Sequence, residues 1–373
     1  MKQVYVKIII LSITFTVGII ASIGFKEMHN EEQLFPGKNI TKLGQLSDYF
    51  EGIKNTRGDT KVYIFDSGKE GATVFLGGGT HPNEPAGYMA AVVILENIKV
   101  DKGRVIVVPR LNNSAFTCND PMEAYPSSFE IKTDKGIREF RFGSRGTNPL
   151  DQWPDPLVYS QYPSGQQYSG MDSRNLNRCF PGRPNGSHTE KVAYAIVQLL
   201  KKEKVDIAFD LHEAAPEIPI INAIVYHEKS EEIAMGAILE LEFELENEKY
   251  APELSPQNFH GLSHREWGDN TDVLPFLMET SSPIQGRLRG KTNIELMMSG
   301  YSPNYIAAKK TGALRIDVRD EGEQLEHRVG RHVTGFKAIL SSYNELNPDN
   351  TIELSGLPSY EELMTNKIGK YLN

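Results

Sequence analysis

Short apolar runs bounded by turn residues recur along the first part of the chain and predict buried strands. The clearest cover residues 61–65, 72–76 and 104–109. Residues 86–98 have the length and apolar content of a helix, and Pro85 suits the first position of that helix. The order strand, strand, helix, strand is typical of an α/β protein, in which parallel neighbours are joined by right-handed crossovers.

The pattern continues in the second half of the chain. It predicts strands at residues 205–211, 223–226 and 273–279, and helices at residues 190–204, 231–245 and 331–345. Pro275 is tolerated near the start of its strand or on a sheet edge. Residues 115–168 are rich in Pro, Gly, Ser and aromatic residues without a clear period. So long an irregular stretch inside a globular chain is usually functional or mobile.

The amino terminus has the layout of a signal peptide or membrane anchor. Lys2 and Lys7 precede an uncharged apolar run at residues 8–25, which Lys26 and Glu27 close. The run is about as long as a bilayer-spanning helix needs to be. Small residues at positions 22–24 leave cleavage open, and a buried core helix is the alternative interpretation. We expect the remainder of the chain to lie outside the cytoplasm, either secreted or anchored.

Composition narrows the class of protein. The chain has 373 residues, of which 39% are hydrophobic and 24% charged, as in ordinary globular proteins. A formal charge of -9 argues against a nucleic-acid partner. Cys118 and Cys179 are too few for a disulfide scaffold, although one bridge or two separate thiols both remain open. We divide the chain into a signal or anchor (1–26), a linker with a first surface helix (27–57), a catalytic domain (58–345) and a C-terminal tail (346–373).

The glycine-rich turn after the predicted strand at residues 72–76 carries His81 and Glu84. This turn lies at the carboxyl end of a strand, where open α/β sheets bind ligands. We interpret the two residues as ligands of one zinc ion. A His-x-x-Glu pair also arises by chance, and Glu84 is equally suited to the start of a surface helix because the helix dipole favours a carboxylate there.

His212 is the candidate for a third protein ligand, which leaves one position of a catalytic zinc open. It follows the predicted strand at residues 205–211, and Asp210 shares its face of that strand. Asp210 is therefore a candidate to accept a hydrogen bond from the imidazole and so orient it towards the metal. His260 and His264 compete for this role, but no predicted strand end presents them.

Two further segments offer groups for binding and catalysis. The loop at residues 173–182 contains Arg174, Asn175, Asn177 and Arg178, which together make it rich in donors that match a carboxylate. A solvated loop with incidental charge is the alternative. Glu279 ends the apolar strand at residues 273–279, and near a metal-bound water it can act as a general base. A satisfied structural carboxylate is the alternative there.

Taken in order, these motifs resemble the succinylglutamate desuccinylase and aspartoacylase branch of the zinc-carboxypeptidase superfamily. The resemblance rests on His81-x-x-Glu84, the Asn175-Leu176-Asn177-Arg178 loop, Asp210-Leu211-His212 and the Met278-Glu279 strand end, and it covers roughly residues 61–280. It implies an α/β/α sandwich around a mixed, mostly parallel eight-stranded sheet. It also implies one Zn²⁺ ion and hydrolysis of an amide bond next to a carboxylate.

The resemblance also implies roles for individual residues. His81, Glu84 and His212 are similar to the zinc ligands, and Glu279 to the carboxylate that activates water. Asn177 and Arg178 are similar to the pair that binds the substrate carboxylate. Asn175 stands where the aspartoacylase pattern usually has Asp. Arg174 and Arg145 both qualify as the arginine that polarises the scissile carbonyl, and we slightly favour Arg174 because it belongs to the same loop.

We therefore predict a zinc-dependent metallohydrolase of carboxypeptidase or N-acyl amino acid deacylase type. Its substrate would be a small acyl amino acid or peptide that carries a carboxylate. One alternative is an extracytoplasmic peptidase or amidase acting on cell-wall or peptide material. A second is a zinc-containing binding module without turnover. A serine hydrolase is a poor fit, because the chain contains no Gly-x-Ser-x-Gly elbow.

Overall fold

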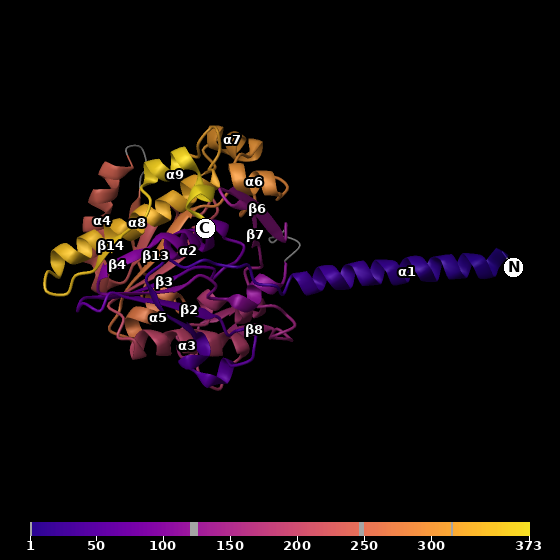
Figure 1. Ribbon diagram of the computed structural model, residues 1–373, viewed down its shortest axis with the longest axis horizontal. Coiled ribbons are helices and arrows are strands. Elements are labelled where there is room, and N and C mark those ends of the chain that lie inside the picture. The colour runs from indigo at the N-terminus through magenta and orange to yellow at the C-terminus, as the bar shows by residue number, and fades with distance from the viewer. Residues whose placement is uncertain (1, 120–125, 246–249, 315) are drawn as a thin grey trace.

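The computed structural model describes residues 2–119, 126–245, 250–314 and 316–373. A central sheet with helices on both faces forms the body, and one long helix, α1 (Lys2–Glu27), projects from it (Figure 1). The sheet has eight strands in the order β1-β2-β5-β3-β10-β13-β11-β12. Their bounds are β1 Ile40–Gln45, β2 Lys61–Asp66, β5 Arg104–Val108, β3 Thr73–Gly77, β10 Ile207–Ala214, β13 Leu274–Ser281, β11 Ala223–Tyr226 and β12 Ala251–Leu254.

The middle of the sheet is parallel and its flanks are mixed. Strands β5, β3, β10 and β13 run parallel to one another, while β1, β2 and β11 each pair antiparallel with a neighbour and β12 runs parallel to β11. Pro275 lies near the start of β13, where a missing backbone donor is tolerated. The predicted α/β/α sandwich around a mixed eight-stranded sheet is confirmed.

Alternation along the strands divides the interior into two cores. Leu76 and Phe209 point to a core that includes side chains of α2, α4 and α8, whereas Phe75 and Ala208 point to a core on the side of α3 and α5. The helices are α2 Pro85–Asn97, α3 His188–Lys202, α4 Glu231–Glu244, α5 Ser263–Asn270, α6 Ile294–Ser299, α7 Pro303–Lys310, α8 Leu325–Leu346 and α9 Tyr360–Asn366. Both faces of the parallel strands are therefore covered, as such strands require.

Residues 115–168 were predicted to be an irregular stretch, and two hairpins form there, the second ending at Ser169. They are formed by β6 (Ser128–Thr133) with β7 (Gly136–Arg141), and by β8 (Val158–Ser160) with β9 (Gln167–Ser169). The strands of the second hairpin have only three residues each, too short for a clear hydrophobic period.

The prediction of a first surface helix within residues 27–57 is wrong. Those residues form strand β1 and two short 3₁₀ turns. Most side chains of β1 are exposed, and its register with β2 holds it in place. An edge strand held by backbone hydrogen bonds leaves little apolar signal in the sequence.

The predicted tail also belongs to the folded body. Within residues 346–373, β14 (Glu353–Ser355) pairs with β4 (Lys99–Lys102), and α9 packs on α8. Leu363, Ile368 and Leu372 are buried in the core shared with α2 and α8. Helix α8 begins at Leu325, earlier than predicted.

Helix α1 lies outside both cores. The helix at Gln3–Glu27 contains an 18-residue window with a mean hydropathy of 2.4, and none of that window is buried. The alternative of a buried core helix is therefore excluded, and a signal sequence or an anchor remains. Cys118 and Cys179 are both free thiols.

Candidate functional site

The candidate site lies at the carboxyl edge of the parallel strands. His81 and Glu84 occupy the turn between β3 and α2, and His212 lies near the end of β10. The ligand atoms of these three buried residues all lie within 4.8 Å of one another. The fold thus brings together two segments that are far apart in sequence, as the sequence analysis predicted.

Glu84 joins the two imidazoles. Its Oε1 lies 2.9 Å from Nδ1 of His81, and its Oε2 lies 2.9 Å from Nδ1 of His212. Oε2 also accepts a hydrogen bond from the backbone N–H of Glu213 at 3.0 Å. Burial raises the pKa of Glu84, but the neighbouring His81 and His212 outweigh burial and hold that pKa well below its ordinary value.

A glycine allows this approach of α2 to β10. A Cβ added to Gly87, in the first turn of α2, would lie 2.2 Å from the carbonyl oxygen of Leu211. Only a residue without a side chain lets the start of α2 lie so close to the end of β10. That contact brings Glu84 within reach of His212.

The outer nitrogens of both imidazoles also face oxygen atoms. Nε2 of His81 lies 2.8 Å from Oδ1 of Asn175, and Nε2 of His212 lies 2.9 Å from Oδ2 of Asp210. Asp210 in turn accepts hydrogen bonds from the hydroxyls of Thr80 and Ser263. These partners orient both rings so that each Nδ1 points at Glu84.

His81 has too few N–H groups to donate to both of the oxygen atoms that its ring nitrogens face. Burial and the nearby Arg145 lower the pKa of His81 to about 4, so its imidazole is neutral at pH 7 and carries one N–H. Both of its nitrogens nevertheless face oxygen acceptors, Oε1 of Glu84 and Oδ1 of Asn175. One of these contacts has no hydrogen, which fits a bound cation between Nδ1 and the carboxylate. Two imidazoles and one carboxylate are also a ligand set that zinc commonly takes.

Glu279 lies beside this cluster. In the ladder between β10 and β13 it is the direct partner of His212. Its Oε2 is buried and has no hydrogen-bond partner among the described residues. Burial raises the pKa of Glu279 to about 8, and the nearby carboxylate of Glu84 adds to this effect. A carboxyl group with such a pKa exchanges its proton readily near neutral pH.

A cavity of about 210 Å³ opens beside these groups. It is lined by His81, Glu84, His212, Glu279, Arg145, Asn177, Arg178 and His264, and by apolar side chains such as Ile218, Val225, Phe259 and Leu277. Charged groups at one end and apolar walls elsewhere suit a small ligand that carries both a carboxylate and an apolar part.

Arg178 offers the cavity a cation without a paired carboxylate. Its guanidinium lies over the rings of Tyr168 and Phe259, at 5.6 and 5.2 Å from their centroids. Within the part of the chain that the structure describes, it forms no ion pair with an acid. Burial and the nearby Arg145 lower the pKa of Arg178. An anionic ligand bound to Arg178 would offset both the burial of its charge and the repulsion from Arg145.

Asn177 also lines the cavity. Its side-chain oxygen accepts a hydrogen bond from the backbone N–H of Ser263 at 2.8 Å. The fixed oxygen leaves the NH₂ group of Asn177 as the part of the amide that can donate to a ligand.

The two candidate arginines for the carbonyl differ in position. Nη1 of Arg145 lies 2.8 Å from Oε1 of Glu84, and Arg145 lines the cavity. Arg174 instead binds Asp155 with two hydrogen bonds, of 2.7 and 2.9 Å, and does not line the cavity. Arg145 is therefore better placed than Arg174 to reach a ligand in the cavity, contrary to the slight preference for Arg174.

His264 lines the cavity, although the sequence analysis placed it in a loop without a strand end. It lies on α5, and its Nδ1 is 2.8 Å from the hydroxyl of Ser255. Burial lowers the pKa of His264 to about 3, so the imidazole is neutral. The helix has only eight residues, which gives a weak periodic signal, and only the packing of α5 reveals this position.

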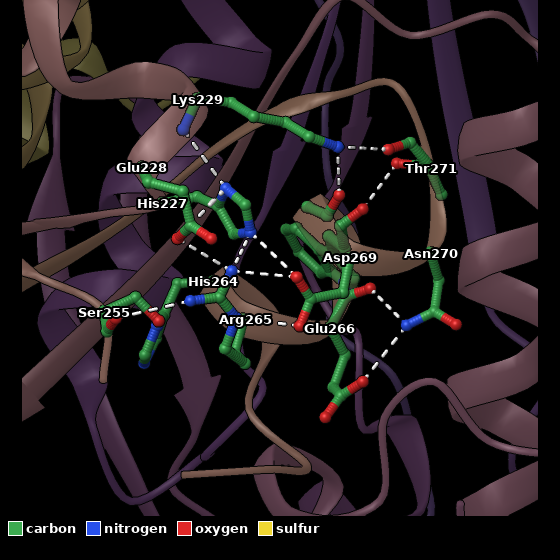
Figure 2. Close-up of polar contacts among 12 residues, drawn as sticks. His227, Glu228, Lys229, Ser255, His264, Arg265, Glu266, Asp269, Asn270 and Thr271 are labelled. Atoms are coloured by element: carbon green, nitrogen blue, oxygen red, sulfur yellow. Dashed lines mark hydrogen bonds and ion pairs between the residues drawn. The ribbon is translucent and has the colours of Figure 1, made fainter. Parts of the chain in front are cut away.

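A second group of metal-ligand side chains lies on the outer side of α5. His227, Glu228 and Asp269 have ligand atoms within 4.8 Å of one another. Figure 2 shows the guanidinium of Arg265 among them. Arg265 is buried, and its Nη2 lies 2.8 Å from both Glu228 and Asp269. The guanidinium supplies the positive charge there, so this group anchors α5 and is no candidate metal centre.

The comparisons with known proteins agree with the sequence motifs. Residues 161–253 match the family described as the succinylglutamate desuccinylase/aspartoacylase catalytic domain. The predicted resemblance to this family is confirmed. The matched segment includes Asn177, Arg178 and His212.

One curated relative is the N-alpha-acetyl-L-2,4-diaminobutyric acid deacetylase of Halomonas elongata. It is 28% identical over 160 residues, which cover 42% of this chain and 33% of the relative. The chain thus matches about a third of the length of that protein.

Solved structures of related proteins are similar at lower identity. A succinylglutamate desuccinylase/aspartoacylase from Rhodobacter sphaeroides is 16% identical with a TM-score of 0.38, covering 62% of this chain and 54% of that one. The tripeptide-bound cell shape determinant Csd4 from Helicobacter pylori is 15% identical with a TM-score of 0.45, covering 80% and 56%. The chain spans a little over half of each.

Proposed function

We propose that this protein is a zinc-dependent hydrolase that cleaves an amide bond next to a carboxylate, as an N-acyl amino acid deacylase or carboxypeptidase does. The observation that carries the proposal is the buried cluster of His81, Glu84 and His212 beside a cavity that Glu279 and Arg178 also line. The family match over residues 161–253 supports a hydrolase of the deacylase class.

The proposed cofactor is one Zn²⁺ ion held by His81, Glu84 and His212. When bound, zinc would act as a Lewis acid and lower the pKa of water. Asn175 and Asp210 would keep both imidazoles in the orientation that points Nδ1 at the ion. The donor set fits this metal, and the missing proton at His81 supports a cation at this position.

Glu279 is the proposed general base. Its carboxylate would accept the proton of the attacking water and pass it to the leaving nitrogen. Its pKa of about 8 suits both steps, because the group can hold the proton near neutral pH and release it again.

Arg145 is the proposed donor to the scissile carbonyl. Its guanidinium already lies against Glu84 within the cavity, and a donor aimed at a developing oxyanion lowers the barrier by roughly 3–4 kcal/mol in comparable sites. Arg178 and Asn177 would bind the substrate carboxylate and so set its distance from the reacting bond.

The alternative substrate class is peptide or cell-wall material outside the cytoplasm. The exposed apolar helix α1 favours it, because a secreted or anchored enzyme meets such substrates more often than small cytosolic metabolites. The same cluster would serve both reactions. A binding module without turnover is the remaining alternative, against which the buried Oε2 of Glu279 speaks, since no described residue pairs with it.

Metal analysis of the purified full chain, run with a hydrolysis panel, tests the proposal. We expect about one equivalent of zinc and release of a carboxylic acid from N-acyl amino acids. Release of a C-terminal residue from peptides would instead favour the alternative of a peptidase that acts on peptide or cell-wall material. A protein with zinc and no turnover on any member of the panel would favour the binding module.

A further inference from the structure

One exposed apolar surface of the body has no part in the proposed function. Large apolar side chains are exposed on the segment that contains the β8–β9 hairpin, and five of them are more than half exposed. They are Leu150 (85% exposed), Trp153 (70%), Leu157 (100%), Val158 (52%) and Met171 (60%). We call these five residues the apolar patch.

The chain segments on either side of the β8–β9 hairpin lie next to each other. Val158 pairs with Ser169 in the β8–β9 ladder, two residues before Met171. Gly170 lies so close to Pro156 that an added Cβ would be 1.7 Å from the Pro156 carbonyl oxygen. Leu157, Val158 and Met171 therefore lie on adjacent segments of the chain.

The segment at residues 146–171, which carries the patch, presents no unpaired charge. Between residues 146 and 171 the chain has no Lys, Arg, His or Glu, and its two acids are Asp151 and Asp155. Asp151 accepts a hydrogen bond from the hydroxyl of Ser114, and Asp155 binds Arg174. Both carboxylates are thus engaged within the body, whereas the apolar side chains remain outside.

Helix α1 reaches the body without a flexible linker. The backbone N–H of Asn30 donates to the carbonyl of Glu27 at 3.0 Å, so the helical turns continue beyond α1. Glu31 then pairs with Lys61, and the buried Glu32 pairs with Arg110 at 2.7 Å. The chain from Glu27 to Glu31 can span at most about 14 Å. A bilayer around α1 would therefore lie directly against the body.

The apolar patch belongs to the same side of the body as the end of α1. Glu31 contacts Asn113 at 3.5 Å, and the next residue, Ser114, holds Asp151 beside Leu150. Figure 1 shows the β8 region near the point where α1 leaves the body, with α4 on the opposite side.

We propose that the apolar patch is a membrane contact, which rests on the lipid of the bilayer that α1 spans. Trp and Tyr favour the level of the lipid headgroups, and exposed Leu side chains there gain by leaving water. With two contacts, α1 and the patch, the body is held in one orientation on the membrane. The inference applies to the chain with α1 uncleaved and is independent of the proposed catalysis.

Tryptophan fluorescence tests the proposal, because the chain has only two tryptophans. Trp153 is exposed in the patch, and Trp267 is fully buried in the core on the α3 side. The full chain is reconstituted in phosphatidylcholine vesicles with or without bromine atoms near the start of the acyl chains. We expect brominated lipid to quench part of the emission of the wild type, and W153F to lose this quenching.

A matched control moves the tryptophan to the other side of the body. Phe243 on α4 is 86% exposed, so W153F/F243W carries an exposed indole away from α1. We expect its emission to be unaffected by brominated lipid. Quenching of this control, or equal emission of the wild type in both lipids, overturns the proposal. In that case, quenching by acrylamide distinguishes the two remaining states of Trp153. Strong quenching means that Trp153 faces water, and weak quenching means that a second copy of the chain covers it. Either result contradicts a lipid contact.

Discussion

Glu279 lies near the end of β13, and two features of its surroundings are unfavourable for a carboxylate. Its strand neighbours are apolar, so the sequence alone marks the carboxylate as costly to bury. The structure adds that this carboxylate lies across the ladder from His212 and has an oxygen without a hydrogen-bond partner among the described residues. A group kept under such conditions at a cavity wall is expected to serve a reaction, and it offers two separate tests.

The first test concerns turnover. Glu279→Gln keeps the shape of the side chain and removes its basicity. We expect turnover to fall by roughly 10²–10⁴-fold while the zinc content is unchanged. Metal analysis and initial rates on the same sample check this. A variant that retains its turnover would remove Glu279 from the proposed mechanism.

The second test concerns stability of the metal-free protein. The pKa of Glu279 rises from 4.5 to about 8 on folding, so the folded state favours the protonated carboxyl. Wild type then loses stability as pH rises from about 4.5 to 8, and below that window the penalty is absent. Glu279→Gln has no such loss, and it should be more stable at pH 7 by at most about 3 kcal/mol. Denaturant unfolding in the presence of a chelator measures the difference, and a gain that is constant down to pH 4 would contradict this assignment.

Arg178 permits a test of substrate recognition. Replacing it with Ala should raise KM for substrates that carry a carboxylate by roughly 10- to 150-fold, because a hydrogen bond to a charged group is lost. The matched control is Arg183→Ala, since Arg183 lies against Tyr162 and does not line the cavity. Equal effects of Arg178→Ala on substrates with and without the carboxylate would refute the role.

At the scale of elements, the contact between α2 and β10 decides whether the metal ligands meet. The turn after β3 delivers His81 and Glu84, but Glu84 reaches His212 only because Gly87 lets the helix approach Leu211. On the other side of the site, α5 is anchored by Arg265 and positions Ser263 against Asp210. The site therefore depends on how two helices pack against one strand.

Gly87→Ala tests this contact. The added methyl group would displace α2 from β10 and separate Glu84 from His212. We expect a loss of zinc affinity and a destabilisation of about 1–3 kcal/mol, typical of overpacking. Gly290→Ala is the control, because the nearest atom to its added Cβ is 3.8 Å away. Full zinc content in Gly87→Ala would show that the helix position does not matter.

At the scale of the whole molecule, both ends of the chain were predicted to lie outside the catalytic domain, and the two ends behave differently. The end after residue 346 packs its apolar side chains on α8 and α2, and the backbone N–H of Asn373 donates to Glu96. Helix α1 contributes nothing to either core.

Truncation distinguishes the two ends. A chain that stops at Leu346 loses Leu363, Ile368 and Leu372 from the core, each worth roughly 1.5–3 kcal/mol. We expect it to be insoluble or to lose cooperative unfolding. A chain without residues 1–26 should unfold at the same temperature as the full protein. Thermal unfolding monitored by circular dichroism compares them, and a stable chain ending at Leu346 would contradict the packing described here.

The sequence by itself determined the order of the main strands and helices, the position of the metal-ligand candidates and the prediction of Glu279. These features depend on the hydrophobic period, the turn residues and the strand ends, and each of these is set by residues close together in the sequence. Edge strand β1 and the short helix α5 left too weak a period to be recognised.

Only the tertiary structure decided which side chains meet. Arg145 and Arg174 are of the same type and both precede Asn177, yet one contacts Glu84 and the other binds Asp155. The cluster of His227 and Asp269 has the residue types of a metal site, but Arg265 lies among them. The sequence contains the groups but not the distances between them, because those distances follow from the packing of elements far apart in the chain.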